Sequence, residues 1–483
     1  MDSKLTVERK KWSENFSEWF HDVIERAENI DYRYPIKGCG VWLAYGLKFR
    51  NNIVNIIRQL LDQTGHEEMM FPILIPEDLL AKEATHIRSF EDEAYWITHG
   101  GTTPLDIKLA LRPTSETAIT PMVKLWVRSH ADLPKKVFQV GSIFRYETKA
   151  TRPLIRVREV TTFKEAHTFH ATHEEAEAQV MEAVKIYSQF LNELNLPFVV
   201  SRRPDWDKFA GANYSIAFDT VFPDGRTLQI GTVHDLGQNF SKPFEVSYEK
   251  KDGTREYAWS TSYGISERAI AAVITVHGDD RGLVLPPKIA PIQVIVVPIP
   301  YKGMEDKIYR NSKEVVETLK AAGFRAEIDL RDEITPGSKF YNWELRGVPI
   351  RIEIGPEDVK RAQVTIARRD ILEKVKCPKK ELVKAVQDLS AKIEEELKNH
   401  AWRWLRDHIQ RAENLKEAQK MLAEEKGIIE IPWCEDNDCG LKIEEEVNAR
   451  ILGIPLTREK IPFMKCPICG RTAKNLVRLG KAY

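Results

Sequence analysis

The sequence predicts an α+β protein in which a large antiparallel sheet with helices packed on it comes first, a small α/β unit second and a small C-terminal α+β lobe last. Three observations predict this order. Strand-like runs and amphipathic helices fill the first half, a proline-rich junction at 286–291 precedes a regular alternation of strands and helices, and four cysteines gather near the C-terminus. We therefore expect domains at 1–285, 291–380 and 381–483.

In the first half, apolar periodicity predicts helices at four places and alternation predicts the strands between them. The expected helices are 8–27, 41–63 (ended by Gly65), 114–130 and 174–194. An extended segment at 69–75, interrupted by Pro72, precedes the expected strands at 136–146, 155–170, 198–202, 215–220, 227–235 and 256–263. An apolar helix at 269–276 follows the last of these strands.

The second half changes rhythm after the junction, which we interpret as a linker. Expected strands at 294–297, 325–329, 350–354 and 363–368 alternate with expected helices at 307–322 and 337–346. The short connections between them are typical of a compact α/β unit. Beyond Pro378 a highly charged helical stretch runs to about Lys426 and leads to the cysteines.

Composition places the chain among globular proteins. Its 483 residues are 42% hydrophobic, enough for about three domains with buried cores. Lysine plus arginine equals aspartate plus glutamate, at 72 each, so nucleic-acid binding would have to come from local patches. Residues 1–12 are polar and charged, and the longest apolar run, 292–299, is too short for a bilayer. We expect a cytoplasmic protein with no membrane contact.

Two close cysteine pairs predict a metal site. In a cytosolic protein such pairs indicate metal binding before they indicate disulfides, and the spacing favours tetrahedral thiolate ligation of Zn²⁺ over unligated thiols. The expected ligands are Cys434, Cys439, Cys466 and Cys469. Four thiolates leave no open position for a catalytic water, so the predicted role of the zinc is structural.

A stretch rich in arginine carries the clearest chemical signal. If 144–147 and 156–159 are both strands, Arg145, Glu147, Arg156 and Arg158 project from one hairpin surface. Guanidinium groups grip phosphate and carboxylate oxygens, and a neighbouring carboxylate can accept from an amino group such as that of adenine. This surface suits a nucleotide, although the segment alone is equally consistent with an exposed, charge-rich hairpin.

Other polar residues fall at strand faces and helix starts. Thr114, Ser115 and Glu116 begin a helix, where a capping box is the simpler interpretation. Phe163, Glu165, His167 and Phe169 share a strand face, Gln229, Thr232 and His234 lie on a second strand, and 260–268 runs from a strand into a helix. The alternation of a strand argues against a joint metal site at His167, His170 and His173.

Together these motifs resemble the prolyl-tRNA synthetase family of the archaeal and eukaryotic type, within the class II aminoacyl-tRNA synthetases. The resemblance covers nearly the whole chain. Segment 46–72 is similar to the first class II motif, which forms a homodimer, 145–159 to the second and 264–268 to the third. The family usually carries tryptophan where this chain has Phe163, which keeps an aromatic ring but loses the indole donor.

The resemblance implies ATP, Mg²⁺ and proline as ligands and assigns roles by position. Arg145 would bridge the proline carboxylate and the α-phosphate, Glu147 would accept from adenine, Arg156 would reach the outer phosphates, and Arg268 would stack on adenine near the γ-phosphate. Gln229 and Thr232 would hold the ribose and phosphate side of the nucleotide. The implied residues of the proline site are Thr114, Glu116, Phe163, Glu165, His167, His234, Ser262 and Gly264.

The implied reaction forms prolyl-adenylate and transfers proline to the terminal ribose of tRNA(Pro). Bacterial relatives carry an editing insertion between the second and third motifs, whereas 158–264 is already filled by expected strands and helices, so no cis editing domain is expected. The implied anticodon readers are Phe340, Glu344, Arg351 and Asp358, with a surface ion pair as the alternative for Glu344 and Arg351. The family's chains also end in a residue like Tyr483, whose carboxylate would turn back toward the catalytic domain.

Two rivals remain at this level. Threonyl enzymes hold an active-site zinc with cysteine and histidine, but Cys39 is the sole cysteine of the first 290 residues. A non-catalytic, tRNA-binding paralogue would be expected to lose the phosphate-gripping arginines, which this chain keeps at 145, 156 and 268. The chain lacks a glycine-rich phosphate loop, which argues against a generic ATPase.

Overall fold

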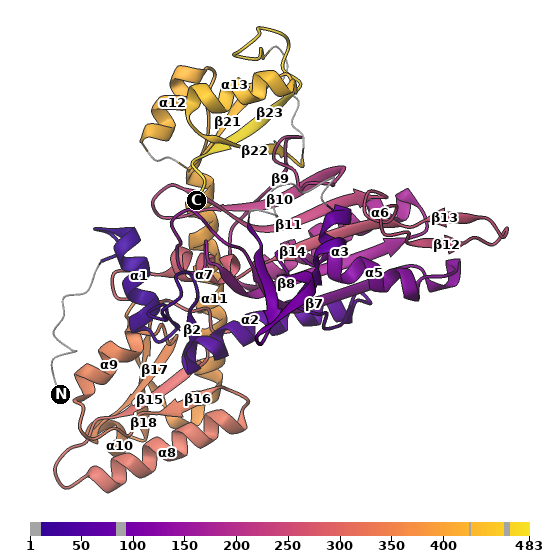
Figure 1. The fold of residues 1–483 in the computed structure, drawn as a ribbon. Coiled ribbons are helices and arrows are strands. Elements are labelled where there is room, and N and C mark those ends of the chain that lie inside the picture. Colours follow the sequence, from indigo (N-terminus) through magenta and orange to yellow (C-terminus); the bar gives the residue numbers. More distant parts are fainter. Residues whose placement is uncertain (1–10, 84–92, 425–426, 458–463) are drawn as a thin grey trace.

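A sheet of eleven strands runs through the middle of the molecule and continues into the cysteine lobe at one end, with the α/β unit at the other end (Figure 1). The computed structural model describes residues 11–83, 93–424, 427–457 and 464–483. The strand order of the sheet is β20-β21-β23-β22-β9-β10-β11-β14-β8-β7-β3, and neighbours are antiparallel except in the pairs β20–β21 and β3–β7. None of the described helices is long and apolar enough to cross a membrane.

The first part of the chain supplies the centre of this sheet and the helices that cover it. Its elements are α1 (Phe16–Arg26), β1 (Ile30–Asp31), β2 (Val41–Trp42), α2 (Ala44–Asp62), β3 (Glu67–Glu68), β4 (Leu74–Pro76), α3 (Glu77–Glu83), β5 (Tyr95–Gly100), β6 (Thr103–Leu111), α5 (Glu116–Trp126), β7 (Lys135–Phe144), β8 (Glu159–His170), α6 (His173–Glu193), β9 (Val199–Arg202), β10 (Tyr214–Val221), β11 (Thr227–Gly237), β12 (Ser247–Glu249), β13 (Arg255–Tyr257), β14 (Trp259–Ile265) and α7 (Arg268–His277).

Helix α6 shows why these residues fold as they do. Thr172 caps the helix by accepting a hydrogen bond from the backbone N–H of Glu175. Its apolar residues recur three and four apart, so one face, including Tyr187 and Phe190, is buried in the main hydrophobic core. The same core contains residues of α2 and α7, so these helices pack together with α6.

Several boundaries differ from the sequence-based expectations. The start of the expected helix at 8–27 lies partly outside the described residues, and α1 begins after Asn15, which caps it. The expected helix at 41–63 gives up two residues to β2, because Trp42 pairs with Ile30 across a short ribbon. The expected strand at 256–263 is divided at Ala258, since β13 pairs with β12 in a separate ribbon whereas β14 joins the main sheet. The hairpin β5–β6 was not predicted.

The α/β unit has a five-stranded sheet of order β16-β15-β17-β18-β19. Its elements are β15 (Val294–Pro298), α8 (Glu305–Ala321), β16 (Ala326–Ile328), α9 (Pro336–Leu345), β17 (Ile350–Ile354), α10 (Pro356–Lys360), β18 (Gln363–Arg368) and β19 (Lys374–Pro378). The junction at 286–291 is a fixed connection rather than a loose linker. Ile289 and Ala290 are buried in the main core, and the Arg325 guanidinium donates to the carbonyls of Pro287, Lys288 and Ala290 at 2.8–2.9 Å.

The C-terminal elements extend the main sheet instead of forming a sheet of their own. They are α11 (Leu382–Asp407), β20 (Ile409–Arg411), α12 (Leu415–Ala423), β21 (Ile428–Trp433), α13 (Asn437–Val447), β22 (Arg450–Pro455) and β23 (Asn475–Gly480). Strand β22 pairs with β9, where Ile454 lies opposite Arg202. The end of the chain also returns to β11 in the middle of this sheet, because the Thr227 N–H donates to the Lys481 carbonyl at 2.9 Å.

Candidate active site

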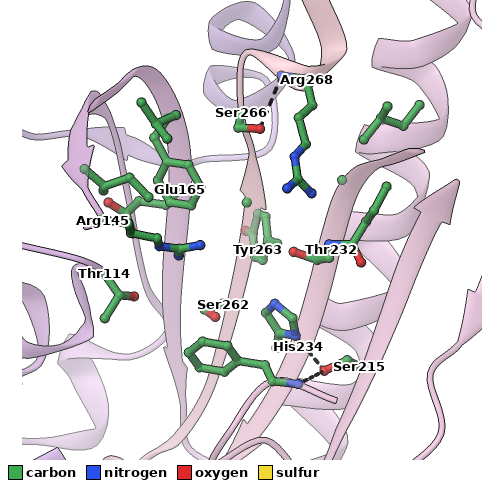
Figure 2. A pocket seen from close by; sticks show the side chains of 18 of the residues that line it. Thr114, Arg145, Glu165, Ser215, Thr232, His234, Ser262, Tyr263, Ser266 and Arg268 are labelled. Carbon is green, nitrogen blue, oxygen red and sulfur yellow. Dashed lines mark hydrogen bonds between the residues drawn. The ribbon is translucent and has the colours of Figure 1, made fainter. Parts of the chain in front are cut away.

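A cavity of about 290 Å³ opens on the face of the sheet formed by β8, β11 and β14 (Figure 2). The β7–β8 connection and the start of α7 complete its wall. The structure brings to this cavity every residue that the sequence predicted for catalysis, substrate or nucleotide. These residues are Thr114, Glu116, Arg145, Glu147, Arg156, Phe163, Glu165, His167, Gln229, Thr232, His234, Ser262, Gly264 and Arg268.

The prediction that the arginine-rich stretch forms a two-stranded hairpin is wrong. Strand β7 ends at Phe144 and β8 begins at Glu159, so the charged residues between them lie in the connection and not on two strand arms. Arg145, Glu147 and Arg156 line the cavity, whereas the Arg158 guanidinium lies 4.6 Å from the centre of the Tyr146 ring and donates to the Glu147 carbonyl at 3.2 Å. Arg158 therefore braces the connection from the side, which strand alternation could not have predicted.

Three guanidinium groups converge on the cavity. Arg268 donates from Nε to the Ile155 carbonyl at 3.0 Å, and Arg145 donates from Nε to the Pro113 carbonyl at 3.2 Å. Burial lowers the pKa of Arg268 to about 10, and the positive charges of Arg145 and Arg156 contribute to the same shift. Arg268 is still a cation at neutral pH, so the three charges repel one another until an anionic ligand neutralises them.

Buried carboxylates face the same cavity. The Thr114 hydroxyl donates to Glu116, and Glu165 Oε2 lies 3.4 Å from His167 Nε2. Although burial alone would raise it, hydrogen bonds from His167, Ser115 and Gln139 hold the pKa of Glu165 below its ordinary value. The cavity thus offers anionic and cationic groups together, which suits a zwitterion beside a polyanion.

Ser115 does not cap α5 with its side chain, so the capping-box interpretation is wrong for this residue. The helix begins at Glu116 with Ser115 in the N-cap position, but the Ser115 side chain makes no cap hydrogen bond. Its hydroxyl donates to Glu165 Oε1 instead. The sequence motif therefore serves the cavity and not the helix end.

His234 is held in one tautomer by a serine that the sequence did not single out. The Phe209 N–H donates to Ser215 Oγ at 2.9 Å, and Ser215 Oγ lies 2.7 Å from His234 Nδ1 (Figure 2). Ser215 is buried, and Nδ1 is the acceptor available to its proton, so His234 carries its own proton on Nε2. Burial lowers the pKa of His234 to about 3, and this ring stays neutral.

Gln229 has a similar support that sequence analysis missed. The Arg203 guanidinium donates to Gln229 Oε1 at 2.8 Å and to Asp219 Oδ1 at 2.8 Å, and it also donates to the Leu452 carbonyl at 2.8 Å. Arg203 is 8% exposed, so its charge is compensated inside the protein. The group that orients Gln229 therefore also contacts the C-terminal lobe.

The predicted anticodon residues form two groups. The Arg351 guanidinium lies 4.2 Å from the centre of the Phe340 ring and donates to Glu344 at 2.9 Å. Glu344 also accepts from Arg281, which follows α7, at 3.2 Å. Asp358 has other partners, because it caps α10 through the Gly355 N–H and pairs with Lys376 at 2.9 Å. The alternative for Glu344 and Arg351 was a surface ion pair; the two residues do pair, but largely inside the protein, with 14% and 10% of their side chains exposed.

The four C-terminal cysteines meet. The sulfur atoms of Cys434, Cys439, Cys466 and Cys469 all lie within 4.8 Å of one another, and Cys434 and Cys469 are 3.7 Å apart. A tetrahedron with metal–sulfur bonds of about 2.3 Å has sulfur–sulfur edges of about 3.8 Å. The donor set and its spacing therefore fit Zn²⁺, with no vacant ligand position for chemistry.

Comparison with known proteins places this architecture in a family. Residues 95–277 match the tRNA synthetase class II core domain (G, H, P, S and T), 293–389 match the anticodon binding domain, and 415–483 match the C-terminal domain of prolyl-tRNA synthetase. Over 480 residues the chain is 54% identical to the proline–tRNA ligase of Pyrococcus horikoshii, covering 99% of this chain and 100% of the relative. The chain belongs to the prolyl-tRNA synthetase family.

Other members of the prolyl-tRNA synthetase family agree over the full length. The proline–tRNA ligase of Sulfurisphaera tokodaii is 55% identical over 483 residues, 99% of this chain and 100% of the relative. The Giardia lamblia prolyl-tRNA synthetase in complex with prolyl-adenylate has a TM-score of 0.94 at 35% identity, covering 99% of each chain. The Cryptosporidium parvum prolyl-tRNA synthetase complexed with halofuginone and AMPPNP has the same score and identity, covering 98% of this chain and 99% of the other.

Proposed function

We propose that this chain attaches L-proline to tRNA(Pro) in two ATP-dependent steps, through prolyl-adenylate. The observation that carries the proposal is the meeting of Arg145, Arg156 and Arg268 with two buried carboxylates, Glu116 and Glu165, around one cavity. Full-length relatives at 54–55% identity are proline–tRNA ligases, and a similar structure holds prolyl-adenylate. The protein would work in the cytoplasm.

Catalysis in this proposal is positioning and charge stabilisation. The proline carboxylate attacks the α-phosphorus of ATP and pyrophosphate leaves, so negative charge gathers on the phosphoryl oxygens. Arg145 would hold the carboxylate and α-phosphate, Arg156 the outer phosphates and Arg268 the adenine face and γ-phosphate. Because Arg145 and Arg268 are already fixed by backbone carbonyls, little reorganisation of these two groups is needed when the charge develops.

The rest of the nucleotide and its metal would be held nearby. Glu147 would accept from the adenine amino group, while Gln229, fixed by Arg203, and Thr232 would contact the ribose and phosphates. Magnesium would neutralise phosphate charge, and it binds mainly through those phosphates and water. The cavity needs to supply one or two carboxylates at most, and Glu147 lines it.

Proline would be recognised by its charged secondary amine and by the size of its ring. Thr114, Glu116 and Glu165 would take the amine, while Phe163, His167, His234, Ser262 and Gly264 would surround the ring and carboxylate. A smaller amino acid loses only about 1–3 kcal/mol of binding in such a site, so alanine and cysteine should also be activated. Strands β9–β14 and α6 fill the interval between the second and third motifs, so we propose that the enzyme does not deacylate alanyl-tRNA in cis.

Three further assignments complete the proposal. Phe340, Glu344, Arg351 and Asp358 would read the anticodon, whose unstacked bases suit arginine, carboxylate and aromatic partners. Zn²⁺ on the four cysteines would stabilise the C-terminal lobe. A homodimer would form over the segment that leads into β4, where Met70 is 93% exposed and the next residue, Phe71, packs against the exposed Trp126 of α5.

The test of the catalytic proposal is proline-dependent ATP–pyrophosphate exchange by an Arg145→Ala variant. Loss of a positioned charge at the reacting phosphate should lower the rate at least about a thousand-fold. Arg33→Ala is the matched control, since this arginine of the same domain is 72% exposed and should leave exchange unchanged. Equal melting temperatures would show that both variants fold, and near-normal exchange by Arg145→Ala would refute the proposal.

A further inference from the structure

Gln139 of β7 is a buried glutamine that stands behind the cavity. It lies opposite Glu165 in the β7–β8 register and is 2% exposed. Its amide takes part in four hydrogen bonds to groups of three different segments, with Phe71, Arg112, Ser115 and Glu165 as partners. All the hydrogen-bonding capacity of this side chain is used, and one of its partners is a carboxylate of the cavity. Packing alone does not explain such an arrangement.

The orientation of the Gln139 amide is forced by its partners. Its Oε1 accepts from the Phe71 N–H at 3.2 Å and from Arg112 Nη1 at 3.1 Å, and both of these groups can only donate. Its Nε2 must therefore face the other way, where it donates to Ser115 Oγ at 3.0 Å and to Glu165 Oε1 at 2.8 Å. A flipped amide would leave two donors facing two donors, at a cost too large to tolerate inside the protein.

Arg112 makes this support rigid. It donates from Nε to the Ser142 carbonyl at 2.8 Å and from Nη1 to the Phe71 carbonyl at 3.0 Å. A side chain at Gly141 would collide with the Arg112 guanidinium, so the glycine leaves the space that the arginine fills. The glutamine thus rests on a fixed cation and a fixed backbone N–H.

The two oxygens of Glu165 have different surroundings as a result. Oε1 accepts from Gln139 and Ser115 and is turned toward β7. Oε2 has His167 Nε2 as its partner at 3.4 Å among the described residues, and Glu165 lines the cavity. This leaves Oε2 as the oxygen with capacity for a ligand N–H.

We propose that Gln139 is a positioning residue that keeps Glu165 ionised and directs Oε2 at the ammonium group of the amino-acid substrate. The inference rests on the proposed function for the identity of that substrate. It makes Glu165, with Glu116, part of the recognition of the charged amine. It also explains why a neutral donor stands at position 139, where a second carboxylate would repel Glu165.

The test compares Gln139→Met and Gln139→Glu with Gln179→Met. Gln179 is a second buried glutamine, which donates to Tyr263 Oη under the sheet, so its variant reports the general cost of losing such a residue. Gln139→Glu can still accept from Phe71 and Arg112, but as a carboxylate it cannot donate and places a second negative charge beside Glu165, whereas Gln139→Met removes the donor without adding charge. We expect the KM for proline to rise about 10- to 100-fold in both Gln139 variants, with the KM for ATP within about two-fold.

The pH profile gives a readout that a purely structural role would not move. Around Glu165, the groups His167, Arg112, Arg145 and Lys164 favour its charge, and Glu116 is a second carboxylate that lines the same cavity. Removing the Gln139 donor raises the pKa of Glu165, so protonation occurs at higher pH. The acidic limb of kcat/KM for proline should therefore move to higher pH in Gln139→Met and stay in place in Gln179→Met.

The outcomes separate this inference from the proposed function. A Gln139→Glu variant with a normal KM for proline, or equal losses for proline and ATP with an unmoved acidic limb, would overturn the role of Gln139. If the wild-type protein activates no proline, the proposed function fails. The role of Gln139 toward Glu165 can then still be tested without substrate, by melting temperatures measured over a range of pH. Gln139→Met should then be destabilised most at neutral pH and approach wild type as pH falls through the acid range, because the stabilisation that it lacks is lost from wild type there too. The deficit of Gln179→Met should stay constant with pH, and the same pH dependence in both variants would overturn the inference.

Discussion

Replacing Glu267 by glutamine should stabilise the protein at neutral pH and leave its stability at pH 5 unchanged. Glu267 is 2% exposed, lines the cavity, and accepts from Thr161 Oγ1 at 3.0 Å. Burial raises its pKa from 4.5 to about 8, and the charge of Glu159 acts in the same direction. The Thr161 hydroxyl and the charge of Arg50 oppose the shift without cancelling it.

The sign and size of the effect follow from proton linkage. Between pH 4.5 and 8 the folded protein holds a proton on Glu267 that the unfolded chain has released, so stability falls as pH rises through this window. At pH 7, about 2.5 pH units above the unfolded value, the cost is about 3 kcal/mol at about 1.4 kcal/mol per unit. Glutamine keeps the hydrogen bond from Thr161 and has no proton to lose, so it removes this cost.

Melting temperatures measured from pH 5 to pH 8.5 provide the assay. The Glu267→Gln variant should melt about 5 °C above wild type at pH 7 and together with it at pH 5. The wild-type KM for ATP should also rise above pH 8, as a carboxylate forms beside Arg268, while that of the variant stays level. Parallel melting curves for the two proteins across the whole range would refute the reasoning.

Three other predictions concern the remaining surfaces. Glu344→Gln should raise the KM for tRNA about ten-fold and leave pyrophosphate exchange unchanged, because the lost charge lies in the anticodon unit; equal loss in both assays would argue against anticodon reading. Met70→Glu should shift the protein toward monomers in sedimentation velocity, since it puts a charge at the centre of the proposed dimer surface, and an unchanged sedimentation coefficient would speak against that surface. Cys466→Ser should lower bound zinc, measured by mass spectrometry, to well below one ion per chain and lower the melting temperature; full zinc content would exclude Cys466 as a ligand.

The sequence predicted the cavity better than the supports behind it. Phe163, Glu165 and His167 alternate along β8, so one face of a strand could be read directly from their spacing. Gln139 and Ser215 could not be found in this way, because each acts through a residue on a neighbouring strand, and strand register depends on packing across the whole sheet.

Long-range pairing limited the fold prediction for the same reason. The strands around 201 and 455 pair with each other although they lie far apart in the chain. No local feature of either sequence segment predicts this pairing. The buried junction at 286–291 is a second example. Its prolines have the composition of a spacer, but the carbonyls of Pro287, Lys288 and Ala290 accept hydrogen bonds from Arg325, which lies more than thirty residues later.

The β22–β9 pairing makes the lobe a cover for a sheet edge. If the chain were cut after α11, β9 would present a bare row of backbone donors and acceptors, which is a template for strand exchange between molecules. Truncated variants of this protein should therefore aggregate even though every residue that lines the cavity before the cut is still present. By pairing with β9, the lobe protects the edge of the catalytic sheet from other molecules, and this role is separate from metal binding by its cysteines.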